Sequence, residues 1–425
     1  MDRLILGENA IFSTNCSETG LNNNVLVCGG SGSGKTMSVS EPRLLETYHS
    51  SLIAVVSKRK IVNKYKPILK KRGYTVEDLN FIHPLESTAA YDPLQYISGY
   101  QDIAFLAEAI VKSDPKKDKS VADPYWDEAA VSLLSAEIAY IIMKKDNPTF
   151  TDVLKLHDSI DFKEENGQIA TSLDYHFEYL ARTDPGCYAV SCWKSFRRLP
   201  IKTASCVFSS LNVMLDTIFS QELRDMIRMN KKLDFKELSS QKTVLFITVS
   251  AVNPALHSFV NMFYAHMFKQ LFEYAEDCPE GKLPIPVHVL CDDFATGSRI
   301  LNFPEYISII REKQISVTML VQSESQLERM YGTEDAVTII NNCDTYLYMG
   351  GMDLKTARSV SERLNIPLED VLYMPIGQEY IFRRGQKPIV TQRYNVLENE
   401  AYQKITKHYE NRERYSPTLL CKRRG

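Results

Sequence analysis

Short apolar runs alternate with longer segments of helical periodicity along most of the chain. The apolar runs are rich in β-branched and aromatic residues, which predicts buried strands. They cover residues 24–28, 52–56, 74–80, 243–249, 287–291, 316–321 and 345–349. Helical patterns lie between most of them, as at residues 35–48 and 254–276. This alternation predicts an α/β fold whose mainly parallel central sheet is covered on both faces.

The stretch between about residues 100 and 238 has a different pattern, because no run in it predicts a strand. Its periodicity predicts successive helices, at residues 127–144, 151–158, 173–181 and 203–220. We therefore expect two parts, an α/β domain made of residues 1–100 and 239–425 and a mainly helical insert at residues 101–238.

Composition places the chain among ordinary globular proteins. Of its 425 residues, 44% are apolar and 24% are charged, so neither disorder nor a fibrous repeat is indicated. A formal net charge of −3 gives no general attraction to nucleic acid, so any DNA contact needs a local basic patch. The lysines and arginines of residues 404–424 are one candidate, although a solvated tail explains them equally well.

The cysteines, histidines and apolar segments indicate the cellular compartment of the protein and whether it binds a structural metal. The nine cysteines form no C-x-x-C pair and the eight histidines no metal-binding spacing, which indicates reduced core thiols and no structural metal. No apolar segment reaches the roughly 20 residues of a membrane span. We therefore expect a cytoplasmic protein that contacts the inner face of the cell membrane only through a partner.

A glycine-rich loop follows the first of these predicted strands and opens the helix after it. Its residues match G-x-x-x-x-G-K-T and are Gly29, Gly30, Ser31, Gly32, Ser33, Gly34, Lys35 and Thr36. In such a loop the backbone N–H groups surround phosphate oxygens, the lysine reaches the β and γ phosphates, and the threonine hydroxyl binds Mg²⁺. A plain glycine-rich turn is the competing interpretation, which the flanking strand and helix disfavour. The loop predicts ATP and Mg²⁺ as ligands.

Two acids follow the strand predicted at residues 287–291. A P-loop enzyme needs a carboxylate near Mg²⁺, usually at the end of a strand that adjoins the loop strand, and often a second acid that activates water. We expect Asp292 to hold Mg²⁺ together with Thr36, and Asp293 to orient or deprotonate the attacking water. An acidic turn after an ordinary strand is the alternative, and the intact phosphate loop makes it the weaker one.

Two more polar residues lie where predicted elements end. Gln322 follows the strand at residues 316–321, at the carboxyl edge of the sheet where open α/β sheets bind ligands, and its amide can sense the γ-phosphate. A single glutamine is otherwise more often a helix cap or a surface residue. Arg311 lies at the end of a predicted helix and, in a ring of subunits, could reach a neighbour's γ-phosphate. Spacing alone favours a surface salt bridge for this arginine.

With these residues in place, the chain resembles the coupling proteins of conjugative DNA transfer and type IV secretion, the TraG/TraD-type ATPases. The resemblance extends over most of the chain and is weakest in the helical insert. Besides the phosphate loop, its carriers are residues 70–97, 124–140, 291–297, 309–332 and 339–364, which include PYWDEAA, CDDFATG and NNCDTYLYMGG.

The resemblance implies a RecA-like P-loop NTPase fold whose insert contains an all-α, substrate-recognising domain. It implies an ATPase that assembles as a hexameric ring, recruits relaxase-bound single-stranded DNA and passes it to a type IV secretion channel. It supports Asp293 in catalysis and Gln322 as the γ-phosphate sensor. It also implies that Arg311 acts on the nucleotide of a neighbouring subunit.

The sequence departs from the family pattern at three points. Asp293 stands where most members have glutamate, residues 55–60 lack the usual D-P-K-G-E, and the chain begins almost directly at the ATPase fold without the usual N-terminal membrane anchor. We expect a partner to tether it, or a version of the protein that consists of this domain alone. Two alternatives stay open, a DNA translocase of the FtsK/HerA type and an adaptor that binds ATP without hydrolysing it.

Overall fold

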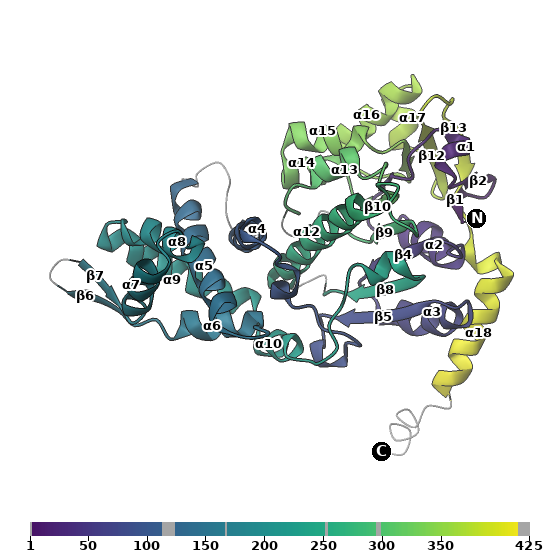
Figure 1. Cartoon of the computed structure of the whole chain (residues 1–425). Helices are drawn as coiled ribbons and strands as arrows, with labels where there is room; N and C mark the ends of the chain where they lie inside the picture. Colours follow the sequence, from purple (N-terminus) through teal and green to yellow (C-terminus); the bar gives the residue numbers. More distant parts are fainter. Residues whose placement is uncertain (1, 113–123, 166–167, 251–253, 295–298, 415–425) are drawn as a thin grey trace, which may run out of the picture.

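The central sheet is the frame on which the molecule is built. The computed structural model describes residues 2–112, 124–165, 168–250, 254–294 and 299–414. Within these residues nine strands form the sheet, in the order β13 (Ile389–Gln392), β12 (Gln378–Arg383), β11 (Thr345–Tyr348), β3 (Val25–Cys28), β10 (Ile315–Val321), β9 (Val287–Cys291), β4 (Ser51–Val56), β8 (Thr243–Thr248) and β5 (Thr75–Asn80). Neighbours from β11 to β5 pair in parallel, whereas β12 and β13 are antiparallel at one edge (Figure 1). The predicted α/β fold with a mainly parallel sheet is confirmed.

The parallel strands are those that the apolar runs predict, with every boundary within one residue. Four further strands escaped prediction: β12, β13, and the N-terminal hairpin of β1 (Arg3–Gly7) and β2 (Ala10–Ser13). The prediction that the insert holds no strand is wrong, because β6 (Phe162–Glu165) and β7 (Gln168–Thr171) pair there as a hairpin. Both strands are short and largely polar, so hydrophobicity carries little signal, although the Asn-Gly pair at 166–167 is a known hairpin signal in sequence.

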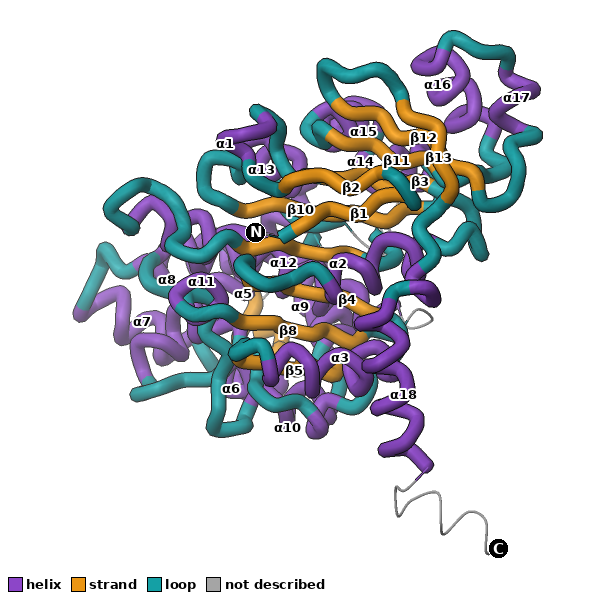
Figure 2. The backbone as a smooth tube through the Cα atoms, turned by 90° about the vertical axis from the view of Figure 1, so that its right-hand side faces the viewer, coloured by secondary structure: helices purple, strands orange, loops and turns teal. Residues whose placement is uncertain are grey.

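Side chains alternate between the two faces along each strand, and helices cover both faces, so both faces of the sheet are buried. In β4, Ile53 and Val55 join the apolar core on one face, while Leu52 and Ala54 join the core on the other. The first face is covered by α12 (Pro254–Asp277), α13 (Phe303–Ile309), α14 (Glu324–Tyr331), α15 (Thr333–Asn341) and α16 (Leu354–Leu364). The second is covered by α2 (Glu41–Leu45), α3 (Arg59–Lys71), α18 (Glu400–Arg414) and β1. Figure 2 shows the strands stacked from β5 to β12, with α18 at the lower right.

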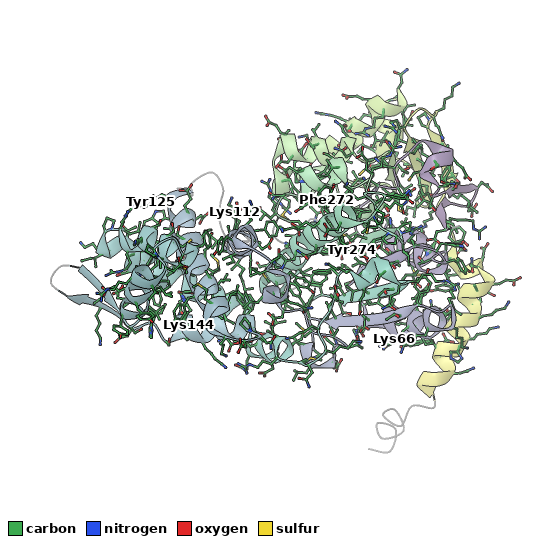
Figure 3. The ribbon with its side chains drawn as sticks, in the orientation of Figure 1. Lys66, Lys112, Tyr125, Lys144, Phe272 and Tyr274 are labelled. Atoms are coloured by element: carbon green, nitrogen blue, oxygen red, sulfur yellow. The ribbon has the colours of Figure 1, made fainter. Side chains whose placement is uncertain are left out.

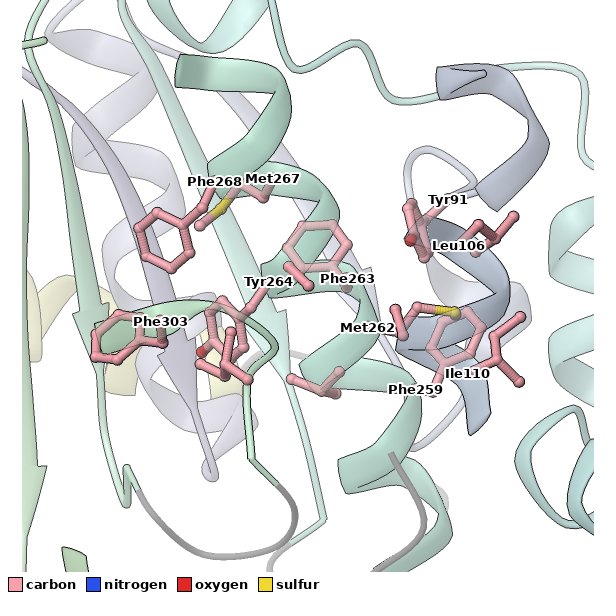
Figure 4. Close-up of a cluster of buried hydrophobic side chains, with 14 of the residues drawn as sticks. Tyr91, Leu106, Ile110, Phe259, Met262, Phe263, Tyr264, Met267, Phe268 and Phe303 are labelled. Atoms are coloured by element: carbon pink, nitrogen blue, oxygen red, sulfur yellow. The ribbon is translucent and has the colours of Figure 1, made fainter. Parts of the chain in front are cut away.

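Helix α12 joins the sheet to the helical part of the chain. Phe263 packs edge-on against Tyr91, with ring centroids 5.0 Å apart. Phe268 lies on the other side of the helix, with its ring centroid 5.6 Å from that of Phe303. The close-up also shows α4 (Tyr100–Val111) beside the first of these contacts (Figure 4). A helix packed on two sides needs apolar residues on both of them, and the buried apolar residues of α12 accordingly lie on more than one side of the helix.

Helices dominate the part of the chain that projects from one side of the sheet (Figure 1). They are α5 (Pro124–Lys144), α6 (Phe150–Asp158), α7 (Asp174–Thr183), α8 (Tyr188–Arg197), α9 (Ile201–Ile218) and α10 (Gln221–Ile227). Helix α5 packs against α4, α6, α8 and α9 and runs between the labelled Tyr125 and Lys144 (Figure 3). Short helices elsewhere are α1 (Cys16–Thr19), α11 (Glu237–Ser240), α17 (Leu368–Leu372), η2 (Pro84–Glu86), η3 (Pro93–Tyr96) and η4 (Val396–Glu398). Within the described ranges, no helix combines the length and apolar content that a membrane crossing requires.

Candidate nucleotide-binding site

The glycine-rich loop leaves the carboxyl end of β3 and is tied to both neighbouring strand ends. The N–H of Gly29 donates to the Val321 carbonyl at 3.1 Å, and that of Gly30 to the Gly350 carbonyl at 2.8 Å. A side chain at Gly29 would place its Cβ 2.6 Å from the Ser33 hydroxyl, and Gly34 has a φ of 92°. Only glycine tolerates such crowding and such a backbone, so these positions explain the spacing of the motif.

Lys35 and Thr36 begin the helix that follows and point into the loop. The Lys35 ammonium donates to the carbonyl oxygens of Gly29 and Gly30, the latter at 3.0 Å. Burial lowers the pKa of Lys35, and the negative charge of Asp293 raises it. A buried ammonium held inside a ring of backbone amides can neutralise the charge of a terminal phosphate.

Thr36 and Asp292 meet across the site, as predicted for a magnesium pair. The Thr36 hydroxyl donates to the Asp292 carboxylate, with an Oγ1 to Oδ2 distance of 3.1 Å. Burial and, after it, the adjacent Asp293 charge together raise the pKa of Asp292 to about 6. A proton or a cation therefore stabilises this carboxylate, and oxygen donors are the ligands that Mg²⁺ prefers. The pair fits a bound magnesium ion.

Asp293 occupies a sharp turn directly after β9. Its φ of 55° lies in the left-handed region, which aspartate and asparagine tolerate better than most residues. A cavity of about 70 Å³ adjoins both acids and is also lined by His257 and Tyr264. This space exceeds the roughly 10–15 Å³ that one water needs, so a water can reach the acids.

The strand order corrects one expectation. The strand that carries Asp292 was expected to adjoin the loop strand, but β10 lies between β3 and β9. Asp292 still reaches Thr36, because β3 and β9 flank β10 in parallel and their carboxyl ends therefore lie at the same edge of the sheet. Gln322 follows β10 and therefore lies between the loop and the acids, where its exposed side chain can approach a terminal phosphate.

Arg311 lies at the opposite edge of the sheet. It comes just before the amino end of β10, and its Nη2 donates to the Gly20 carbonyl at 2.8 Å. The seven residues of β10 separate it from Gln322, a span of roughly 20 Å at about 3.3 Å per residue. The structure does not bring Arg311 to the phosphate loop of its own chain.

The single helix predicted after the loop is replaced by two shorter pieces. A π-helix, η1 (Thr36–Ser40), precedes α2, and the N–H of Glu41 donates to the carbonyl five residues back. Pro42 is the physical reason, because its ring would clash with the carbonyl four residues back in a regular α-helix. A wider turn avoids the clash, and such π-turns are frequent at functional sites.

Arg393 is a residue of the site that sequence reasoning missed. It follows β13, and its Nη1 donates to the Ser33 carbonyl at 2.9 Å. A Cβ at Gly34 would lie 2.9 Å from the same nitrogen, so the guanidinium packs directly on the loop. The backbone N–H of Arg393 donates to the Gly377 carbonyl at 2.8 Å, which fixes the position of Arg393. Its contact spans 360 residues of sequence, and no local motif marks it.

Comparison with known proteins places the chain in a family. A family model described as Type IV secretory system Conjugative DNA transfer matches residues 4–365. The chain belongs to this family. No protein of curated function matches the sequence significantly.

Solved structures agree with the fold. The plasmid coupling protein TrwB in complex with the non-hydrolysable ATP analogue ADPNP superposes with a TM-score of 0.65 at 17% identity, over 88% of this chain and 85% of that one. TrwBdeltaN70 in complex with sulphate gives 0.64 at 17% identity, over 87% and 85%. VirB4 of Thermoanaerobacter pseudethanolicus gives 0.53 at 12% identity, over 92% and 96%. The RecA-like P-loop NTPase fold predicted for this conjugative-transfer protein is confirmed.

Replacing Arg393 with alanine should weaken ATP binding about tenfold, because a hydrogen bond from a charged donor contributes about 1.5–3 kcal/mol and here it holds the loop in its binding shape. The measurement is the dissociation constant of a fluorescent ATP analogue. Arg384→Ala is the matched control, since Arg384 contacts Asp344 and Gly20 instead of the loop. Equal affinity of the Arg393→Ala variant and the control would remove Arg393 from the site.

Glu379, on β12, is fully buried near Arg393. Neither of its carboxylate oxygens has a hydrogen-bond partner within the part of the chain that the structure describes. Burial raises its pKa from 4.5 to about 8, while the charges of Arg393 and Glu8 act in opposite directions. The folded chain therefore keeps this proton over a pH range in which the unfolded chain has lost it.

Stability should consequently fall as pH rises from about 4.5 towards about 8. Glu379→Gln stays neutral, so we expect the variant to exceed the wild type by a few kcal/mol above pH 8, at about 1.4 kcal/mol per unit of pKa difference. Near pH 5 the two should be similar. Urea unfolding at both pH values measures this, and an equal gain at both would contradict the assignment.

Proposed function

We propose that this protein is an ATP-hydrolysing coupling protein that recruits relaxase-bound single-stranded DNA and feeds it to a type IV secretion channel. The observation that carries the proposal is the hydrogen bond from the Thr36 hydroxyl to the Asp292 carboxylate. It has an Oγ1 to Oδ2 distance of 3.1 Å and lies beside the glycine-rich loop that contains Lys35. Membership of the conjugative DNA transfer family supplies the biological setting. The structure of TrwB with ADP and Mg²⁺ supports the same ligands for this site.

Each site residue has a physical task in this proposal. The N–H groups of residues 29–36 solvate the phosphates, and the buried Ser33 hydroxyl, which has no partner in the described ranges, is available to a phosphate oxygen. Lys35 neutralises charge on the β and γ phosphates. Thr36 and Asp292 hold Mg²⁺, which when bound would screen the phosphate charge that builds up during transfer.

Water activation falls to Asp293, with Gln322 reading the γ-phosphate. Asp293 adjoins the cavity that can admit water. Its carboxylate can accept a proton from the attacking water or orient the lone pair of that water. Gln322 lies between the loop strand and the acid strand, so its amide can report whether a γ-phosphate is present. The helical insert at residues 101–238 is proposed to recognise the substrate, and membrane contact to come only through a partner.

The place of Arg311, away from the phosphate loop of its own chain, supports a proposal of shared sites between subunits. A hexameric ring would bring the amino edge of one sheet near the phosphate loop of the next subunit, where Arg311 would stabilise charge in the transition state. Lys35→Ala and Arg311→Ala should each be inactive alone. Mixed in equal amounts, they should regain activity at up to about a quarter of the interfaces, those that combine an intact loop with an intact arginine. A fully active Arg311→Ala variant, or an inactive mixture, would argue against shared sites.

Relaxase recognition separates this function from that of another DNA translocase. The purified chain should retain the cognate relaxase with its attached single strand. A chromosome-segregation or packaging enzyme would instead prefer duplex DNA and ignore the relaxase. Binding assays with both substrates test this, and retention of duplex DNA alone would favour the translocase.

A further inference from the structure

A second cavity opens at the amino edge of the sheet, opposite the phosphate loop. Its volume is about 250 Å³, and the starts of β9 and β10 line it at Val287 and Ile315. One water needs only about 10–15 Å³, so the space accommodates a polyatomic ligand together with solvent. No site predicted for ATP hydrolysis within one chain uses this cavity.

Arg43, on α2, lines the cavity as a buried and unsatisfied cation. The residue is 6% exposed, and its Nε and Nη1 have no hydrogen-bond partner within the described ranges. Burial lowers the pKa of Arg43, and the Asp2 carboxylate raises it. A guanidinium nevertheless keeps its charge at neutral pH, and a buried charge is costly unless an opposite charge compensates it.

The carboxylate with the largest effect on the pKa of Arg43, that of Asp2, is already committed elsewhere. Asp2 accepts hydrogen bonds from the N–H groups of Tyr48 and His49, at 2.7 and 2.8 Å, and from the N–H and hydroxyl of Ser50. Glu46 also raises the pKa of Arg43, but it forms an ion pair with Arg3, and among the described residues no ion pair joins either carboxylate to Arg43. Asp2 therefore offsets the arginine charge only from a distance.

The other arginine of the cavity wall adds positive charge. Arg311 lines the cavity, and the largely exposed His49 also lines it, with its Nδ1 3.5 Å from Asp2. His288 contributes no charge, because burial and the Arg43 charge lower its pKa and its two ring nitrogens contact Ser316 and Thr318. Two arginines thus face one occupied carboxylate, which leaves a net positive cavity.

We propose that this cavity is a binding site for a small oxyanion of the phosphate class, with Arg43 as its principal ligand and Arg311 at its mouth. A planar guanidinium with free N–H groups matches two oxygens of such an anion. The anion supplies the compensating negative charge at the cavity wall that Arg43 forms. The site is separate from the phosphate loop of its own chain, and it rests on Arg43, whereas Arg311 is the residue that it shares with the proposed action on a neighbour's nucleotide.

Sulfate is a suitable probe once ADPNP and Mg²⁺ are present to fill the phosphate loop. The melting temperature of the wild-type chain should rise saturably with sulfate, relative to chloride at equal ionic strength. Arg43→Met should lose this saturable rise, and in chloride it should melt at or above the wild-type temperature because a buried unpaired charge is gone. Arg358→Met, which changes an exposed arginine on α16, controls for the general stabilisation that sulfate gives to any protein.

A crystallographic measurement needs no variant. Wild-type crystals soaked in selenate should show an anomalous peak within hydrogen-bonding distance of the Arg43 guanidinium. An equal sulfate response of Arg43→Met and Arg358→Met would overturn the proposal. So would a selenate map with peaks at the phosphate loop but none at Arg43, which would mean that water alone fills the cavity.

Discussion

Replacing Lys35 with alanine should reduce ATP turnover at least about a hundredfold, the effect typical of removing one preorganised donor from a charged transition state. Lys35 is 9% exposed and points its ammonium into the loop at the Gly30 carbonyl, 3.0 Å away. Because this ammonium would contact the β and γ phosphates, its loss should weaken ATP binding as well as hydrolysis. Steady-state phosphate release and binding of a fluorescent ATP analogue measure the two effects.

Lys58→Ala is the matched control for this substitution. Lys58 is exposed and follows β4 at the same carboxyl edge of the sheet, but it lies outside the loop. Its replacement should leave turnover unchanged. If Lys35→Ala retained more than about a tenth of wild-type turnover, the loop could not be the phosphate site that the account requires.

Asp293→Asn should lower turnover by about 10²–10⁴-fold while leaving ATP affinity nearly unchanged, because general base catalysis contributes that range. Asparagine keeps the shape of the side chain and tolerates the left-handed backbone, where φ is 55°. The substitution therefore removes the charge with little strain. Single-turnover hydrolysis and ATP affinity should be measured together, and a parallel loss in both would point to misfolding or to a binding role.

Asp293→Glu tests the departure from the family pattern. Glutamate is less well suited to the left-handed turn after β9, so we expect no gain in turnover from the longer side chain. A gain of several fold would mean that the natural aspartate is an impaired base. That result would favour the adaptor that binds ATP without turning it over efficiently.

The central strands and the phosphate loop could be predicted because their signals are local. Each central strand is a continuous apolar run, since both faces of a parallel sheet are buried, and the loop is a contiguous motif between strand and helix. The place of Asp292 and Gln322 near the loop could also be predicted from sequence, because residues at the carboxyl ends of parallel strands meet at one edge of the sheet. The order of the strands could not be predicted, because β10 lies between the loop strand β3 and β9, which carries Asp292.

The features that could not be predicted from sequence either depend on contacts between distant segments or lie in strands of low hydrophobicity. Arg393 reaches Ser33 across 360 residues, and its role comes from where β12 and β13 add to the sheet edge. Arg43 reads as an ordinary helix arginine until the fold buries it under the amino edge. The β6–β7 hairpin escaped because its strands are too short and polar for a strand pattern. The basic tail was a candidate DNA contact, but its residues beyond 414 lie outside the described part.

ATP turnover of the purified chain with and without single-stranded DNA tests the central claim most directly. The account predicts turnover that rises when DNA is added and falls to background in the Lys35→Ala variant. Turnover that stays at the Lys35→Ala level with DNA present, in a protein that binds ATP, would contradict it.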